Sequence, residues 1–277
     1  MISFDRYGVE LLRYVDEPDP EPTESPKPYI HPLRTLAGDV VTVYRPHDHR
    51  WHKGLQMTAS HVSGQNFWGG GTYLHEQGYV QLDNNGTMRH DDLSVRSDGL
   101  RGTLTWRSSG GEEWVRELRE IAVRAVDPEN GSWELHWHTE LTGLREEPLA
   151  FGSPTTHGRP LAGYSGLFWR GPRSFTGGEV LAPDGRGGED LMGAKARWLA
   201  FHGRHDEVDR DSTLVFVPTE DCDWFVRSNQ FAAVNPSWAF HREFTLGRGE
   251  SISRSYRLVI ATGAWGRDRI EDYLGGA

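Results

Sequence analysis

The chain has 277 residues, with 30 basic residues against 40 acidic ones and a formal net charge of −10 at neutral pH. This balance argues against nucleic acid or an anionic membrane as the main partner, and a neutral or cationic small molecule is easier to accommodate. The single cysteine, Cys222, excludes an internal disulfide framework and a cysteine-rich metal site, and it suits a reducing compartment.

The N-terminal segment lacks the charged-then-apolar profile of a signal peptide, and no apolar run approaches the length of a membrane helix. We therefore expect a soluble cytoplasmic protein, either a monomer or a homodimer. Residues 16–28 are polar and rich in proline, which predicts a linker or an extended crossing segment rather than a core element. No other boundary is evident, so residues 1–277 are predicted to form one domain.

Residues 44–54 hold the densest group of titratable side chains, with His47, His49 and His52 beside Asp48 and Lys53. Three imidazoles that converge could bind a divalent metal. Alternatively, one could act as a general acid while its neighbours bind substrate hydroxyls. A polar loop whose imidazoles bond to backbone or water is the plainer interpretation, and we favour a functional role for the group as a whole.

Short stretches of alternating or β-branched residues recur between turn residues, which is typical of a β-sandwich or barrel. The predicted strands are Leu55–Val62, Gly102–Trp106, Trp133–Leu141, Ala196–His202, Thr213–Val217, Trp238–Thr245 and Ser253–Ala261. Residues 114–126 have apolar side chains close to helical spacing, but the turn and the alternating segment that follow favour a strand in a long hairpin. Residues 182–193 are predicted to form a surface loop and residues 267–274 a short terminal helix.

Two further segments carry polar side chains in suggestive patterns. Alternation in residues 134–140 places Glu134, His136, His138 and Glu140 on one strand face, and a solvated outer face is the favoured interpretation. Residues 151–175 have no sustained period and read as a long loop whose polar and aromatic side chains could hold a polyhydroxylated ligand. The side chains in question are His157, Arg159, Tyr164, Trp169 and Arg170.

Weaker candidates come from three other segments. Residues 63–72 combine Asn66 and Trp68 with a glycine run, without the context of a phosphate-binding loop. Residues 225–230 and 235–241 could bring Arg227 and His241 to the same cleft, although turn capping and core packing explain them equally well.

The order of several motifs resembles the PmoA-like family of bacterial proteins, which are often labelled methane oxygenase. The motifs are Pro28–Gly38, the His-Asp-His-Arg-Trp-His-Lys-Gly run at 47–54, Asn66-Phe-Trp, Tyr164–Arg170, Ala196–Leu199 and Arg257–Gly263. The label itself conflicts with a chain that has no membrane-spanning segment. His49 and His52 match the family's His-x-x-His-x-Gly element and Arg170 its Gly-Leu-x-x-Arg element, while Lys53 stands where many relatives have arginine.

The resemblance implies an all-β, antiparallel β-supersandwich like that of galactose mutarotases, with few short helices. It also implies a bacterial setting of sugar catabolism. In such folds the site lies on the concave face of the large sheet, where histidine is the acid, a carboxylate the base, and arginine or asparagine holds sugar hydroxyls.

The leading hypothesis is a carbohydrate-processing enzyme that acts on a sugar or oxidised sugar as an epimerase, lyase or glycoside-cleaving enzyme. The candidate catalytic residues are His49, His52, Glu76, Asp92 and Glu120; the candidate substrate-binding residues are Asp48, Lys53, Asn66, Trp68, His157, Arg159, Arg170, Arg227 and His241. No motif identifies the carboxylate base. The leading hypothesis needs no cofactor. A non-catalytic sugar-binding module and a histidine-based metalloenzyme with a divalent ion stay open as alternatives.

Overall fold

Two large antiparallel sheets form the body of the structure, a computed structural model that describes residues 1–275. The first sheet has seven strands, and its outer face carries the pocket described below. In spatial order these strands are β1 (Ile2–Arg6), β2 (Val9–Val15), β3 (Tyr29–Leu33), β4 (Leu55–Ala59), β13 (Ser165–Arg170), β18 (Ala233–Ser237) and β17 (Asp223–Arg227).

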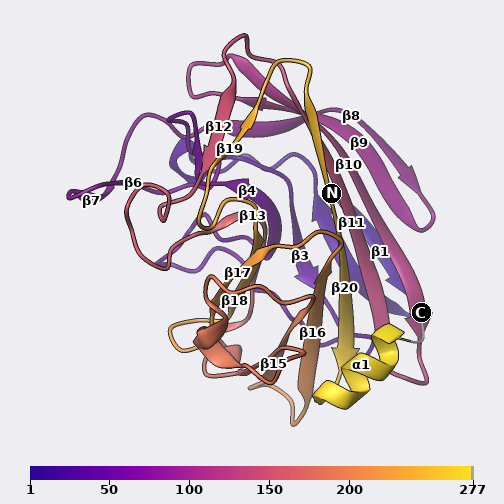
Figure 1. The fold of residues 1–277 in the computed structure, drawn as a ribbon. Coiled ribbons are helices and arrows are strands. Elements are labelled where there is room, and N and C mark those ends of the chain that lie inside the picture. Colours follow the sequence, from indigo (N-terminus) through magenta and orange to yellow (C-terminus); the bar gives the residue numbers. More distant parts are fainter. Residues whose placement is uncertain (276–277) are drawn as a thin grey trace.

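The second sheet has eight strands, which Figure 1 shows as a curved layer on one side of the molecule. In spatial order they are β14 (Glu179–Leu181), β15 (Leu199–Arg204), β16 (Asp211–Pro218), β20 (Ser251–Thr262), β11 (Ser132–Gly143), β10 (Glu113–Asp127), β9 (Gly99–Arg107) and β8 (Thr87–Arg96). The predicted all-β antiparallel sandwich is thereby confirmed.

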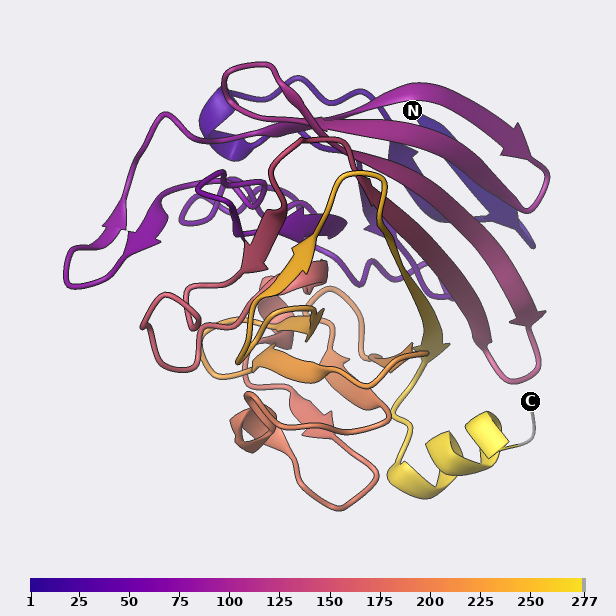
Figure 2. The same cartoon turned by 45° about the horizontal axis from the view of Figure 1, so that its top comes forward.

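Smaller elements connect and cover these sheets. A three-stranded sheet contains β19 (Phe244–Leu246), β12 (Leu149–Gly152) and β5 (His61–Val62). The hairpin of β6 (Thr72–Leu74) and β7 (Gly78–Val80) projects from the body in Figures 1 and 2. The helical elements are η1 (Pro22–Glu24), η2 (Arg173–Phe175), η3 (Gly188–Leu191) and α1 (Arg267–Gly275). No helix within residues 1–275 is long and apolar enough to cross a membrane.

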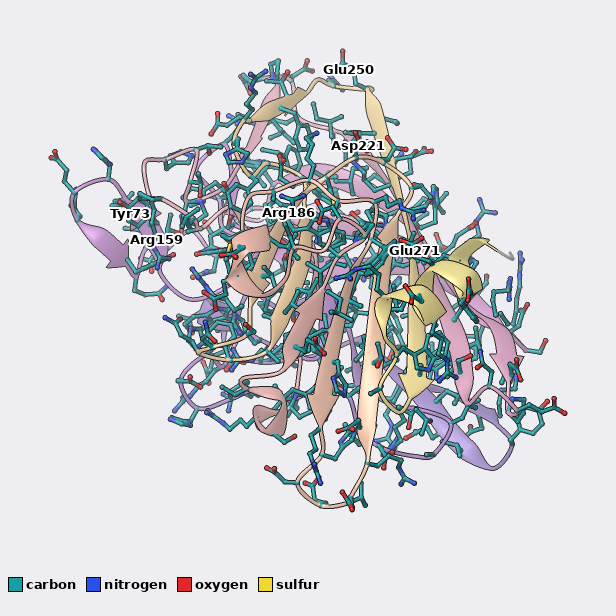
Figure 3. All side chains as sticks on the ribbon, turned by 60° about the horizontal axis from the view of Figure 1, so that its bottom comes forward. Tyr73, Arg159, Arg186, Asp221, Glu250 and Glu271 are labelled. Carbon is teal, nitrogen blue, oxygen red and sulfur yellow. The ribbon has the colours of Figure 1, made fainter. Side chains whose placement is uncertain are left out.

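The main core lies between the two large sheets. Met57 and Trp169 of the first sheet belong to the same buried cluster as Trp106 and Trp137 of the second. A separate apolar layer, which includes Trp265 and Ile270, packs helix α1 on the outer face of the eight-stranded sheet. Figure 3 shows Glu271 on this helix, on the other side of the view from Arg159. The helix predicted over residues 267–274 is confirmed.

Strand β10 resolves the ambiguity between helix and strand in residues 114–126. It pairs with β9 on one side and with β11 on the other, so its backbone groups form hydrogen bonds with both neighbouring strands. Its inward face includes Glu117 and Arg119, both fully buried. These two charged side chains interrupt the hydrophobic alternation of the strand, which is why apolar spacing alone resembled a helix.

The other predicted elements fall near their expected positions with one clear error. Residues 55–62 form β4 and β5, interrupted at Ser60, and the segment at 196–202 begins pairing only at Leu199. The strand predicted at Trp238–Thr245 is wrong, because β18 ends at Ser237 and β19 begins at Phe244. The residues between turn the chain from the seven-stranded sheet to the three-stranded one, and they belong to neither ladder apart from one backbone bond from the Trp238 N–H to the Ser165 carbonyl.

Two segments predicted to be irregular contribute more than expected. The proline-rich residues 16–28 cross the structure in extended form with η1, but Glu24, Ser25 and Lys27 are buried. Burial is possible because their polar groups find partners, as described below. Residues 151–175 include the central strand β13, in which Trp169 faces the core instead of a ligand site.

The buried Glu117–Arg119 pair generates a stability prediction. Arg119 donates from Nε to Oε1 of Glu117 at 2.7 Å and from Nη2 to Oε2 at 2.8 Å. Replacing Arg119→Met leaves a buried carboxylate without its cation, so we expect the free energy of unfolding to fall by about 3–5 kcal/mol. Urea titration monitored by circular dichroism measures this change.

Arg124→Met is the matched control, because Arg124 lies on the same strand in a half-exposed pair with Asp98. Loss of that pair is expected to cost about 0–1 kcal/mol. Equal stabilities for the two variants would contradict the structural role assigned to the buried pair.

Candidate functional site

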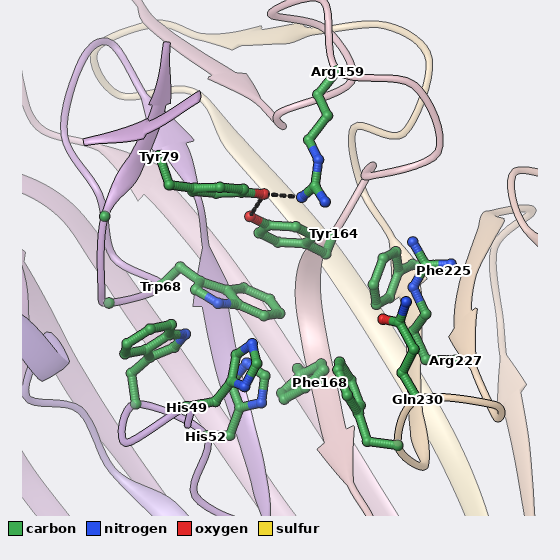
Figure 4. A pocket seen from close by; sticks show the side chains of 14 residues that line it. His49, His52, Trp68, Tyr79, Arg159, Tyr164, Phe168, Phe225, Arg227 and Gln230 are labelled. Atoms are coloured by element: carbon green, nitrogen blue, oxygen red, sulfur yellow. Dashed lines mark hydrogen bonds between the residues drawn. The ribbon is translucent and has the colours of Figure 1, made fainter. Parts of the chain in front are cut away.

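A pocket of about 310 Å³ opens on the outer face of the seven-stranded sheet. Small-molecule pockets usually enclose about 300–1,000 Å³, so this one suits a ligand about the size of one sugar ring. Figure 4 shows its side chains converging from several segments. The lining residues are His49, Trp51, His52, Trp68, Gly69, Gly71, Tyr79, Arg159, Tyr164, Phe168, Phe225, Arg227, Gln230 and Phe231.

Side-chain alternation in β13 and β17 supplies the floor of the pocket. In β13, Leu167 and Trp169 enter the main core, whereas Phe168 joins a separate aromatic cluster on the opposite face. Arg170 shares the side of Phe168 because successive strand residues point to opposite faces. Strand β17 does the same with Phe225 and Arg227, which line the pocket. Both faces of this sheet are therefore occupied, one by core and one by site.

Aromatic rings make most of the pocket wall. Trp68 packs against Tyr164 with ring centroids 4.3 Å apart and against Phe168 at 4.6 Å. Trp51 and Phe231 pack against the same cluster from the two flanking loops. Flat apolar surfaces of this kind match the face of a sugar ring, and their indole and phenol groups add polar contacts.

The glycine run after Trp68 allows the wall to close. A Cβ atom at Gly70, whose φ is +68°, would lie 2.7 Å from the indole ring of Trp51, so a side chain there would displace the ring. Asn66 holds this segment, since its Oδ1 accepts hydrogen bonds from the backbone N–H groups of Trp68 and Gly69 at 2.9 Å each. Asn66 is thus a supporting residue behind the pocket and does not line it.

His49 and His52 meet because the chain turns between them. The backbone N–H of His52 donates to the carbonyl of His49 at 2.9 Å, which closes a tight turn. The two imidazole rings then stack with centroids 4.8 Å apart at the bottom of the pocket in Figure 4. His47 lies outside this pair, with its Nδ1 3.3 Å from the Arg173 guanidinium.

His52 is held as a neutral ring in one tautomer. It is buried, and Arg170 Nη1 donates to its Nδ1 at 3.0 Å. A guanidinium can only donate, so the proton of the neutral imidazole is on Nε2. Burial, together with the positive charge of Arg170, holds the pKa of His52 well below its usual value. Within residues 1–275, Nε2 makes no hydrogen bond and is not fully enclosed, and His52 lines the pocket, so its N–H is open to a ligand.

His49 has the complementary arrangement. Its Nδ1 is enclosed and lies 3.3 Å from Oδ2 of Asp48, close enough for charge attraction although not in hydrogen-bond geometry, while the other carboxylate oxygen of Asp48 accepts from Arg173 at 2.9 Å. Asp48 favours a proton on Nδ1, which leaves the Nε2 lone pair free to accept. Burial lowers the pKa of His49, and Asp48 opposes that shift. The stacked rings thus offer one acceptor and one donor.

A buried charge network supports the site from behind. Glu24 pairs with Lys53 at 2.9 Å and with Arg45 at 2.5 Å. Lys27 donates to the backbone oxygens of Ser25 and Trp68 at 2.7 and 2.9 Å. The proline-rich segment therefore anchors both the histidine loop and the aromatic wall. Lys53, a candidate ligand-binding residue in the sequence, faces this network instead of the pocket.

Several other candidates also lie away from the pocket. Glu76 is exposed in the turn of the β6–β7 hairpin, and Asp92 and Glu120 belong to the eight-stranded sheet. His157 stacks on His61 with centroids 4.3 Å apart, and His241 bonds the carbonyl of Gly193 at 2.8 Å. Among the candidates, those that line the pocket are His49, His52, Trp68, Arg159 and Arg227, with Asp48 and Arg170 directly behind them.

Other pocket residues were missed as candidates from the sequence. Phe168 could have been found, because it lies two residues before Arg170 and therefore on the same face of a strand. Trp51 stands between the two histidines in the sequence. Tyr79, Phe225, Gln230 and Phe231 carry no local signal that distinguishes them from ordinary strand and turn residues.

The histidine cluster does not have the donor set of a metal centre. Within residues 1–275, no group of three or more His, Cys, Asp or Glu side chains is placed to hold a metal ion. Nδ1 of His52 accepts a hydrogen bond from Arg170, and one carboxylate oxygen of Asp48 accepts one from Arg173, so neither atom is free to bind a metal. The residues present therefore do not fit the divalent ion considered from the sequence.

Comparison with known proteins identifies a family and little else. A family described as "Family of unknown function (DUF6807)" matches residues 1–275. No curated protein matches the sequence significantly.

Solved structures resemble the chain only distantly. A putative kojibiose phosphorylase from the human microbiome has 8% identity and a TM-score of 0.35, covering 67% of this chain and 23% of its own. A GH36 α-galactosidase, AgaA, from Geobacillus stearothermophilus in complex with raffinose has 12% identity and a TM-score of 0.39, covering 76% and 32%. The protein HI1317 has 9% identity and a TM-score of 0.32, covering 85% and 92%. The chain thus spans only a quarter to a third of the first two proteins, and scores this low carry no argument about activity.

The contrasting partners of the two histidines generate a titration prediction. Asp48→Asn removes the negative charge that favours protonated His49, so the pKa of His49 should fall. Arg170→Met removes a positive charge beside His52, so the pKa of that ring should rise. Imidazole nitrogen resonances, followed by NMR against pH, measure both, and shifts in the same direction for the two variants would contradict the arrangement.

Proposed function

The chain belongs to the DUF6807 family of unknown function, and we propose that it is an enzyme that binds a sugar or oxidised sugar and transfers a proton. The observation that carries the proposal is the stacked histidine pair, which offers an open Nε2 acceptor on His49 beside an open Nε2–H donor on His52. The aromatic wall would hold the sugar ring above them. The resemblance of the His-x-x-His-x-Gly element to the PmoA-like family, which implies a mutarotase-like fold, supports the same ligand class.

The two histidines have distinct roles in this proposal. His49 Nε2 takes a proton from a carbon or hydroxyl of the substrate, and the lowered pKa keeps the ring unprotonated near neutral pH. The Nε2–H of His52 donates a hydrogen bond to the substrate oxygen on which negative charge develops. Asp48 and Arg170 are positioning residues, because each acts through the imidazole that it contacts.

The proposed chemistry favours an isomerase or a lyase over a glycosidase. Ordinary glycoside hydrolysis uses two carboxylates that flank the scissile bond. Among residues 1–275, no Asp or Glu lines the pocket. Proton abstraction by an imidazole needs only one base and one hydrogen-bond donor, and both are available.

A sugar-binding module without catalysis is the second candidate, because a carboxylate-free aromatic pocket is also suited to binding alone. It differs from the enzyme in one respect that can be measured. The binding module would hold sugars without exchanging any of their carbon-bound protons.

Isotope exchange tests the proposal even while the product is unidentified. The protein is incubated in deuterated water with a panel of monosaccharides, their keto forms and their sugar acids, and proton NMR records loss of carbon-bound signals. We expect exchange for at least one compound, and His49→Ala should slow it by about a hundredfold or more because the base is lost.

His136→Ala is the matched control, since His136 lies on the eight-stranded sheet in contact with Glu134 and away from the pocket. It should exchange protons at the parental rate. Unchanged exchange in both His49→Ala and His52→Ala would rule out the assigned roles. Binding without exchange by the parent protein would favour the binding module.

A further inference from the structure

The end of the pocket formed by Arg159, Tyr79 and Tyr164, here called the donor end, contains hydrogen-bond donors without a matching acceptor. The Arg159 guanidinium bonds the hydroxyl of Tyr79 and lies over its ring, 4.8 Å from the centroid. The hydroxyls of Tyr79 and Tyr164 are 2.7 Å apart. Figure 4 shows this chain of contacts on the far side of Trp68 from the two histidines.

Most of the hydrogen-bonding capacity of the Arg159 guanidinium is not used within the described part of the protein. Within residues 1–275, no carboxylate lies within ion-pairing distance of it, and the Tyr79 hydroxyl is its hydrogen-bond partner. Arg227, the other guanidinium of the pocket, pairs with Glu189 at 3.1 Å and bonds the carbonyl of Leu161. A guanidinium has five N–H donors, so Arg159 retains donors for a ligand.

The two tyrosines add one more donor. One of the two hydroxyls donates its proton to the other. The second hydroxyl therefore keeps an O–H that is free for a ligand, whichever oxygen donates. Burial, with the neighbouring Tyr79 hydroxyl, raises the pKa of Tyr164 well above its usual value, so this phenol keeps its proton. The donor end therefore presents a guanidinium and a phenol hydroxyl to the same small volume.

The charge of the pocket is opposite to that of the chain. The described lining residues include two arginines and no carboxylate, although the whole chain has a net charge of −10. The two lining histidines are neutral, and Arg227 is paired with Glu189, so the positive charge of the lining comes from Arg159. Arg170 adds a buried guanidinium behind His52, again without an ion-pair partner in the part of the chain that the structure describes. An anion would be stabilised here, whereas an amino sugar would bring a second positive charge into a cationic site.

We propose that the substrate is an anionic sugar derivative, whose carboxylate or phosphate is bound by Arg159 and the tyrosine hydroxyls while its ring lies on Trp68. This inference rests on the proposed function and refines its ligand class. It assigns recognition to the donor end and leaves proton transfer to the histidines. The neutral or cationic ligand expected from net charge alone is replaced by an anionic one, because local charge governs binding.

Charged quenchers of tryptophan fluorescence test the local charge without any sugar. Trp51 and Trp238 are the partly exposed tryptophans among the described residues, and Trp51 is the one of the two that lines the pocket, so quenching that changes with Arg159 reports on Trp51. Iodide should quench it more strongly than caesium does, and Arg159→Gln should reduce the iodide effect while Arg159→Lys retains it. Arg124→Gln, which removes the same charge from the other sheet, should leave quenching unchanged. Equal quenching by both ions, or no effect of Arg159→Gln, would overturn the inference.

Matched sugar pairs then test the ligand class by calorimetry. The probes are glucose with glucuronate and glucose 6-phosphate, and galactose with galacturonate and galactose 6-phosphate. We expect the anionic members to bind more tightly, and Arg159→Gln to weaken them by about tenfold to a hundredfold, the loss of charge-assisted hydrogen bonds. The carboxylate and phosphate arms distinguish the two sources of charge.

The outcomes separate this inference from the proposed function. Equal affinities for neutral and anionic members, or equal weakening of both by Arg159→Gln, would overturn the anionic ligand while a sugar site stands. Preferential iodide quenching without binding of any sugar would count against the sugar ligand and leave the cationic, anion-binding pocket standing. Circular dichroism of each variant confirms that the sheet structure is intact.

Discussion

The site depends on a single constraint, the two-sided burial of the central strand β13. Its odd-numbered residues Leu167 and Trp169 fill the sandwich core, so Phe168 and Arg170 must emerge on the other face. Phe168 becomes the pocket floor, and Arg170 sets the tautomer of His52. A shift of one residue in pairing would exchange these roles, which couples the geometry of the site to the stability of the core.

Each polar group of the pocket is oriented by a partner that contacts it on the side facing away from the ligand. Asp48 and Arg170 each contact one nitrogen of a histidine and leave the other facing the pocket. The same principle applies at the donor end, where Tyr79 orients Arg159. Residues one layer behind the pocket surface therefore determine which of its atoms donate and which accept hydrogen bonds, as is common where imidazoles are catalytic or ligand-binding groups.

The sequence predicted the fold class, and it showed that two histidines lie close enough in one loop to meet, for reasons that are local. Alternating segments between turn residues identify strands, and spacing within one short loop brings His49 close to His52. It could not place the carboxylates Glu76, Asp92 and Glu120, which lie away from the pocket, because they were chosen by residue type and their distances from the histidines depend on tertiary structure. It also failed over residues 238–243, which turn between the seven-stranded and the three-stranded sheet instead of forming a strand.

By itself, the sequence determined an all-β chain with a dense histidine loop, since period and residue type are properties of neighbouring positions. Only the tertiary structure decided what that loop faces. Tyr79 reaches the pocket from the β6–β7 hairpin, Arg159 from the loop before β13 and Arg227 from β17, and long-range packing brings these segments together. Net charge likewise came from composition, but the cationic pocket arises from which few side chains converge, a matter of long-range contacts that no local pattern encodes.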